Sequence, residues 1–145
     1  MIAIGSDHGG YLLKEEIKKH LEEKGYEFKD FGTDSTASCD YPVYAEKVCR
    51  AIQSGECEKG ILVCGTGIGM SMCANKCKGI RAAVCGDHFS AEFTRKHNNA
   101  NVLCLGARVT GSGVALQLVD IFLTTEFEGG RHEKRIEMMM ELENK

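Results

Sequence analysis

The sequence predicts a single doubly wound α/β domain over residues 1–145, with a five-stranded parallel sheet, helices on both faces and a C-terminal helix. Short apolar runs that end in glycine recur along the chain, as at 2–5 and 61–65. Runs of this kind suit strands that are buried on both faces. Helical patterns separate them, and no linker or repeat divides the chain. This alternation favours a Rossmann-like domain with right-handed crossovers.

Five segments are predicted to be strands. Four of them are apolar and end in glycine, at residues 2–5, 61–65, 81–86 and 102–106. The fifth, residues 27–32, is more polar, so we expect it nearer an edge of the sheet.

Helical patterns fill the intervals between these strands. Residues 11–24 carry an apolar stripe opposite Lys and Glu, and Gly25 ends the helix. The only proline, Pro42, suits the first turn of a helix over residues 42–53. Further helices are predicted at 67–77, 89–97, 111–124 and, with many charges, about 131–143.

The composition of the chain argues against several classes of protein. The net charge of -3 and the lack of a Lys/Arg block argue against nucleic-acid binding. No segment reads as a signal peptide or reaches transmembrane length, so we expect a cytoplasmic protein that does not bind membranes. The eight cysteines form no Cys-x-x-Cys pair, and several lie in apolar strand-like runs. Reduced, core-packing thiols are therefore expected.

Polar clusters follow three of the predicted strands, where doubly wound folds bind their ligands. They are Ser6-Asp7-His8-Gly9-Gly10, the segment from Cys64 to Gly69, and Gly86-Asp87-His88. The Cys64 segment places a thiol before a turn of backbone N–H groups at a helix start. This arrangement can pair a base with an oxyanion site. Glycine turns also occur as plain scaffold, and by itself the motif leaves both interpretations open.

Other polar residues allow a structural and a functional interpretation. Asp7 is a natural helix cap, and the neighbouring His8 could contact an anion. His97 and Asn98 close a predicted helix. Arg131 and Arg135 stand one turn apart, where they could grip one phosphate or form a solvated face.

Motifs along essentially the whole chain resemble the type B ribose-5-phosphate isomerases, a family that includes allose-6-phosphate isomerases and galactose-6-phosphate isomerase subunits. The motifs are Ser6-Asp7-His8-Gly9-Gly10, Asp40-Tyr41-Pro42, Cys64-Gly65-Thr66-Gly67-Ile68-Gly69, Ala74-Asn75-Lys76, Gly79-Ile80-Arg81-Ala82, Arg95-Lys96-His97-Asn98, Asn101-Val102-Leu103 and Glu128-Gly129-Gly130-Arg131-His132.

The resemblance implies aldose–ketose isomerisation of a sugar phosphate with no cofactor and no metal. It implies a homodimer or dimer of dimers with the active site at the subunit interface. Ribose 5-phosphate and ribulose 5-phosphate are the expected pair, with allose 6-phosphate or galactose 6-phosphate as alternatives. The implied catalytic residues are Cys64 as the base, Thr66 at a substrate oxygen, His97 in ring opening and Asp7 in support. The implied binding residues are His8, Arg108, Arg131 and Arg135 for phosphate, and Asn98, Gly65, Gly67, Ile68 and Gly69 for sugar and enediolate oxygens.

The chain departs from the family pattern at two places. Some members use a carboxylate just after the glycine loop as the base, but this chain has Met70-Ser71 there. The frequent Asp after Tyr-Pro is Val43 here, which leaves the role of Tyr41 in substrate binding open.

Two other classes of protein agree less well with the sequence. A nucleotide-binding module is disfavoured because Gly65-x-Gly67-x-Gly69 is not Gly-x-Gly-x-x-Gly and follows the third strand. We therefore expect no tight binding of NAD or ATP. A redox or metal protein built on the cysteines lacks a complete ligand set, so no stoichiometric zinc or iron is expected.

Overall fold

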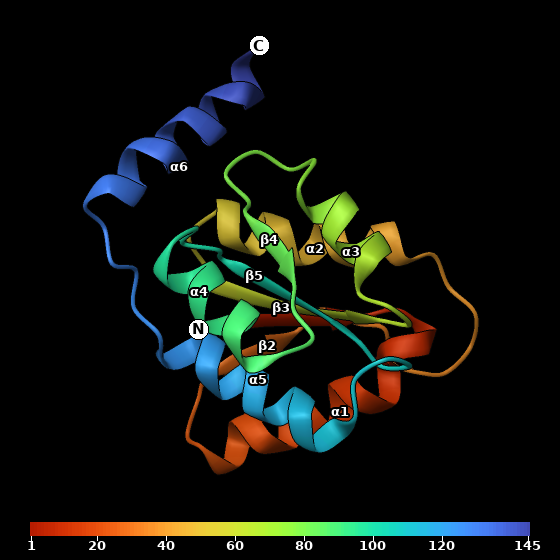
Figure 1. Ribbon diagram of the computed structural model, residues 1–145. Helices are drawn as coiled ribbons and strands as arrows, with labels where there is room; N and C mark the ends of the chain where they lie inside the picture. Colours follow the sequence, from red (N-terminus) through yellow and green to blue (C-terminus); the bar gives the residue numbers. More distant parts are fainter.

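The computed structural model describes all residues, 1–145, and contains one sheet of five parallel strands in the order β2-β1-β3-β5-β4. The strands are β1 (Ile2–Ser6), β2 (Phe28–Asp30), β3 (Lys59–Cys64), β4 (Ala82–Val84) and β5 (Val102–Gly106). Figure 1 shows the sheet at the centre of the molecule. The predicted fold class is confirmed, and the polar strand β2 lies at an edge, as expected.

Six α-helices connect and flank the strands. They are α1 (Tyr11–Glu23), α2 (Tyr41–Gln53), α3 (Ile68–Ala74), α4 (His88–Lys96), α5 (Ser112–Thr124) and α6 (Arg131–Glu141), with short 3₁₀ turns at His8–Gly10 and Leu142–Asn144. All six were predicted, but α3 is shorter than the predicted 67–77. Asn75 exchanges two hydrogen bonds with the backbone of Ala82, at 2.8 and 2.9 Å. This side chain draws the segment after α3 toward β4.

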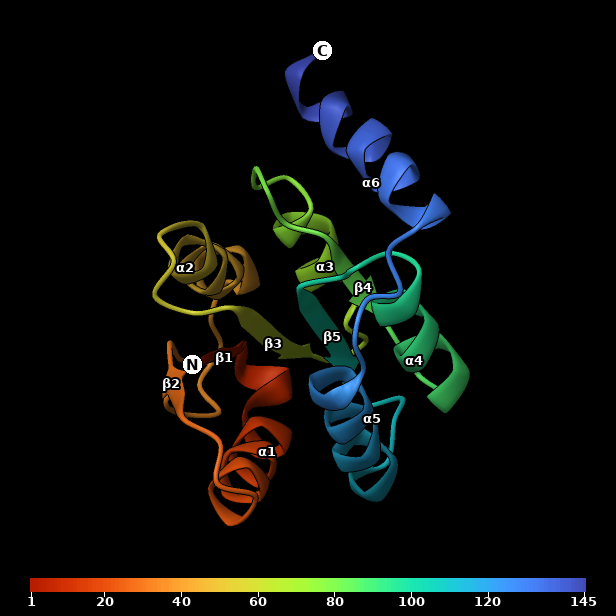
Figure 2. The same cartoon turned by 90° about the vertical axis from the view of Figure 1, so that its left-hand side faces the viewer.

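The helices form two layers. One core packs Ile4, Val63 and Leu105 against α1 and α5, and the other packs Leu62 and Cys104 against α2 and α3. Figure 2 shows these helix pairs on opposite sides of the strands, with α6 extending away from the body. No side chain of α6 is buried. None of the helices combines the length and apolar character that spanning a membrane requires.

All eight cysteines are free thiols. Cys85 and Cys104 lie in the core, where burial raises the pKa of Cys85 to about 11 and that of Cys104 well above its ordinary value. These two side chains therefore stay protonated at neutral pH and pack as small hydrophobic groups.

A buried lysine joins α1 to β2. The Lys14 ammonium group is fully buried and contacts the Asp30 carboxylate at 2.5 Å, while Lys18 reaches the same carboxylate at 2.9 Å from a partly exposed position. We expect Lys14→Met to lower the free energy of unfolding by about 2 kcal/mol, because it removes the buried partner of Asp30. The matched variant Lys18→Met should cost less than about 1 kcal/mol. Urea denaturation measures both, and equal losses would contradict this ranking.

Candidate active site

The candidate site lies where the strand order reverses. The chain passes from β1 to β2 on one side, while β3 lies on the other side of β1. In such sheets the crevice beyond the carboxyl ends of the strands is the usual ligand site. The loops after β1 and β3 meet there, because a methyl group built on Gly9 would lie 3.5 Å from the Gly65 nitrogen. Two of the three predicted clusters therefore converge.

The third cluster lies elsewhere. It follows β4, which is the edge strand on the far side of β5. Asp87 caps α4 by accepting hydrogen bonds from the backbone and the hydroxyl of Ser90, at 2.8 and 2.9 Å. The expected convergence of this loop with the other two was wrong, because alternation along the chain does not fix strand order.

Cys64 is the last residue of β3, and its side chain is almost entirely buried. Its sulfur accepts a hydrogen bond from the Gly67 N–H at 3.1 Å. Gly67 has a φ of +82°, and a methyl group there would lie 3.0 Å from the Leu105 carbonyl carbon. Only glycine fits this turn without strain. The turn therefore aims a backbone donor at the thiol, where it stabilises negative charge on sulfur.

The remainder of the glycine loop carries an exposed hydroxyl and packs against Tyr41. Thr66 is exposed, and its hydroxyl accepts the Ile68 N–H at 3.2 Å, so the Ile68 amide is already engaged within the loop. The Tyr41 ring covers Gly69 so closely that a methyl group there would lie 2.8 Å from a ring carbon. Tyr41 is still 41% exposed, so it packs on the loop and also faces solvent.

The loops after β1 and β5 bring an acid, an imidazole and a guanidinium group toward the glycine loop. One Asp7 oxygen accepts the Gly10 N–H at 3.0 Å, which confirms its capping role. The Nδ1 atom of His8 accepts the Cys39 N–H at 3.3 Å. A neutral His8 ring therefore carries its proton on Nε2 and can donate it. The Arg108 guanidinium lies against Gly65, and its backbone N–H donates to the Gly65 carbonyl at 3.0 Å.

A second cluster surrounds His97, at the C-terminal end of α4. The His97 ring stacks on His132 with centroids 4.1 Å apart, and Phe93 meets it edge-on at 4.9 Å. The His97 Nε2 atom lies 3.4 Å from a Glu128 oxygen. The pKa of His132 lies below its usual range because the ring is partly desolvated by these neighbours. The nearby charges of His97 and Arg131 lower it further. Arg131 and Arg135 are exposed on the first turns of α6.

A buried arginine holds this second cluster in place. Arg95 donates to the carbonyls of Thr125 and Ala100 and to the side chain of Asn99, at 3.1, 2.6 and 2.9 Å. These bonds join the end of α4 to the end of α5 and the start of β5. The exposed Asn98 follows His97 in the same turn.

The two clusters lie at opposite ends of the sheet. Cys64 is in register with Gly106, at the carboxyl end of β5, whereas His97 precedes the amino end of that strand at Val102. The five residues of β5 alone span roughly 13 Å. Within one chain, therefore, His97, Asn98, Arg131 and Arg135 do not reach Cys64.

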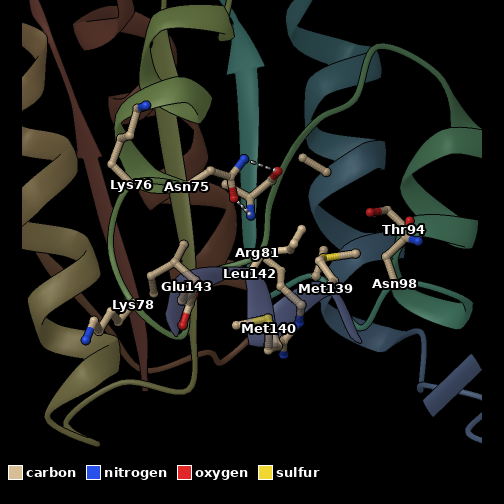
Figure 3. A pocket seen from close by; sticks show the side chains of 14 residues that line it. Asn75, Lys76, Lys78, Arg81, Thr94, Asn98, Met139, Met140, Leu142 and Glu143 are labelled. Atoms are coloured by element: carbon tan, nitrogen blue, oxygen red, sulfur yellow. Dashed lines mark hydrogen bonds between the residues drawn. The ribbon is translucent and has the colours of Figure 1, made fainter. Parts of the chain in front are cut away.

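A cavity of about 690 Å³ lies between α6 and the body of the protein, on the side of Asn98. Figure 3 shows Met139, Met140 and Leu142 beside Arg81, which contacts the Met140 sulfur at 3.6 Å, with Asn98 and Thr94 at one end. The Cys64 loop does not line this cavity. The structure thus leaves an open space beside the His97 cluster.

Several of these contacts were not assigned from the sequence. His132 and Glu128 appear in a family motif, but their contacts with His97 were not predicted. The Phe93–His97 spacing of four residues on one helix was the only local signal. The Cys39 contact with His8 joins residues 31 positions apart and has no such signal.

Known proteins match the chain over nearly its full length. The model of the family described as Ribose/Galactose Isomerase matches residues 2–139. Ribose-5-phosphate isomerase B of Escherichia coli strain K12 is 49% identical over 144 residues, covering 99% of this chain and 97% of its own. The solved Clostridium thermocellum ribose-5-phosphate isomerase B has a TM-score of 0.97 and 53% identity, covering 99% of this chain and 97% of its own. The Mycoplasma genitalium enzyme, solved with bound ribulose-5-phosphate, has a TM-score of 0.94 and 41% identity, covering 99% and 96%.

Proposed function

The chain belongs to the ribose/galactose isomerase family, and from that membership we propose that it interconverts ribose 5-phosphate and ribulose 5-phosphate. The observation that carries this proposal is the Cys64 thiol at the switch point of the sheet, with the Gly67 N–H directed at its sulfur. The same fold holds ribulose-5-phosphate in the Mycoplasma genitalium relative.

The reaction requires a base and fixed donors. Moving a hydrogen from C2 to C1 passes through an enediolate, whose charge must be stabilised as it develops. Cys64 takes the proton from C2 and returns it to C1, and Thr66 contacts a substrate oxygen. The amides of Gly65 and Gly69, Asn98 and the Tyr41 hydroxyl bind further oxygens of the sugar.

The complete site is formed by two copies of the chain. One copy supplies Asp7, His8, Cys64 and Arg108 from the carboxyl end of its sheet. The other supplies the His97 cluster from the amino end. Two observations support this assembly: the distance between the clusters in one chain, and the lack of any buried side chain on α6.

Exposed apolar side chains indicate the surfaces that meet. Ile68 and Met72 are exposed on α3, directly beside the Cys64 loop, and Met138 and Leu142 are exposed near the C-terminus. Apolar groups gathered in this way mark interaction surfaces. In a two-fold dimer, each copy would place its His97, Arg131 and Arg135 against the Cys64 loop of the other.

The residues proposed to bind phosphate also come from both copies of the chain. His8 presents its Nε2–H and Arg108 its guanidinium from one copy, while Arg131 and Arg135 come from the other. Phosphate lies away from the reacting carbons, so its binding energy serves to position them. His97 then assists opening of the furanose ring, with Asp7 in support.

The substrate is tested by comparing kcat/KM for ribose 5-phosphate and allose 6-phosphate. We expect ribose 5-phosphate to be favoured by at least about tenfold, because a pocket fitted to five carbons must shift to admit a sixth. A ratio reversed in favour of allose 6-phosphate, or activity only with galactose 6-phosphate, would assign the chain to one of the alternative substrates. Activity with none of the three would contradict the proposed function.

A further inference from the structure

We propose that His97, Glu128 and His132 form an exchangeable zinc site that inhibits the enzyme when it is filled. The donor atoms of these three side chains all lie within 4.8 Å of one another. Two imidazoles and one carboxylate are a ligand set that binds Zn²⁺ in proteins, with open positions left to water. The inhibitory part of this proposal rests on the proposed function, whereas metal binding does not.

Main-chain contacts bring the three ligands together before any metal binds. The Glu128 N–H donates to the Lys96 carbonyl at 3.1 Å, which ties the segment before α6 to the end of α4. The His132 N–H donates to the Gly129 carbonyl at 3.2 Å. The segment from Glu128 to His132 is thus joined to the end of α4, so the backbone of the site does not need to be assembled by the ion.

The side chains must turn by a small amount to coordinate an ion. The His97 and His132 rings lie nearly parallel, 13° apart, and a metal lies in the plane of each ring that binds it. The rings therefore have to splay at the edge that faces Glu128. Side-chain exposures of 38% for His97 and 47% for Glu128 leave room for this movement and for water ligands.

The charges and dipoles around the three ligands have opposing effects on the binding of a cation. His97 lies at the C-terminal end of α4, where the negative end of the helix dipole favours a cation. The positive charges of Arg131 and Arg135, on the first turns of α6, oppose one. We expect the balance to give a weak, exchangeable site, which agrees with the expectation that no zinc is retained stoichiometrically.

The consequence for catalysis follows from His97. A zinc ion bound to this ring removes the lone pair that ring opening uses, and it occupies the space beside Arg131 and Arg135. The enzyme without zinc is therefore the active form. Substrate phosphate and zinc would compete for the same end of α4.

The binding test uses the full-length protein, dialysed against a chelator and then titrated with Zn²⁺ and with Co²⁺. We expect one ion per chain, and at least about tenfold weaker affinity in Glu128→Gln and in His132→Ala. Glu126→Gln, an exposed carboxylate two residues away, should bind as the wild type does. The Co²⁺ complex should lack the intense thiolate-to-cobalt absorption in the near ultraviolet. Unchanged affinity in both ligand variants would place the metal elsewhere, a thiolate band in the wild type would place it at a cysteine, and either result would overturn the proposal.

The activity test separates this proposal from the proposed function. Zn²⁺ should inhibit the wild type reversibly, with recovery on adding EDTA, while Glu128→Gln, measured against its own rate without zinc, should require at least about tenfold more Zn²⁺ for half-inhibition. Binding at the three ligands without inhibition would overturn the inhibitory role alone. If the chain failed to isomerise ribose 5-phosphate, the proposed function would fail and the binding result would still stand.

Discussion

Cys64→Ala is expected to lower kcat/KM for ribose 5-phosphate by about 10²–10⁴-fold, because it removes the base proposed to take the proton from C2. No carboxylate follows the glycine loop to replace it, since Met70 and Ser71 occupy those positions. Substrate binding should change little, because the phosphate contacts remain. The fold should survive, with a loss of about 1 kcal/mol from the small cavity and the unpaired Gly67 N–H.

Two further variants separate chemistry from packing. Cys64→Ser keeps a group that can accept the Gly67 N–H, yet it should be nearly as slow as the alanine variant, because a serine hydroxyl is a poor base at neutral pH. Cys73→Ala removes a partly exposed thiol on α3 and should retain wild-type turnover. Steady-state kinetics and thermal unfolding measure these effects. Near-normal turnover in Cys64→Ala would rule out the thiol as the base.

Mixing two inactive variants is expected to restore activity. His97→Asn alone should lose turnover of cyclic ribose 5-phosphate, and it should lose less with an open-chain aldose phosphate, which needs no ring opening. Unfolding and refolding Cys64→Ala together with His97→Asn allows hybrid dimers to form. In each hybrid, one site combines an intact Cys64 with an intact His97 of the other copy.

The size of this recovery follows from the share of hybrid dimers and the number of intact sites in each. Random pairing puts half of the dimers in hybrid form with one intact site of two, so we expect about a quarter of wild-type activity. Each variant refolded alone is the control and should remain inactive. No recovery in mixtures shown to contain hybrids would mean that Cys64 and His97 act within one chain. Equal losses on cyclic and open-chain substrates would contradict the ring-opening role of His97.

Local patterns were sufficient for most of the fold. Continuous apolar strands such as Ile61–Cys64 require burial on both faces, which implies a parallel sheet covered by helices. The α3 helix was predicted too long because its end depends on Asn75 binding the backbone near β4. Such a contact joins separate elements, and neither periodicity nor the local sequence reports it.

The same distinction between local features and contacts of distant segments applies to the candidate site. The sequence by itself determined that a thiol, a glycine turn and the Asp7-His8 pair follow strands, because a strand end and a loop are local features. Only the tertiary structure decided which of these meet. Strand order β2-β1-β3-β5-β4 brings Asp7 to Cys64, sends the Asp87 loop to the far edge and leaves His97 at the other end of the sheet. Strand order is set by packing between distant segments, so the sequence predicted the chemical groups, and the fold determined which of them lie together.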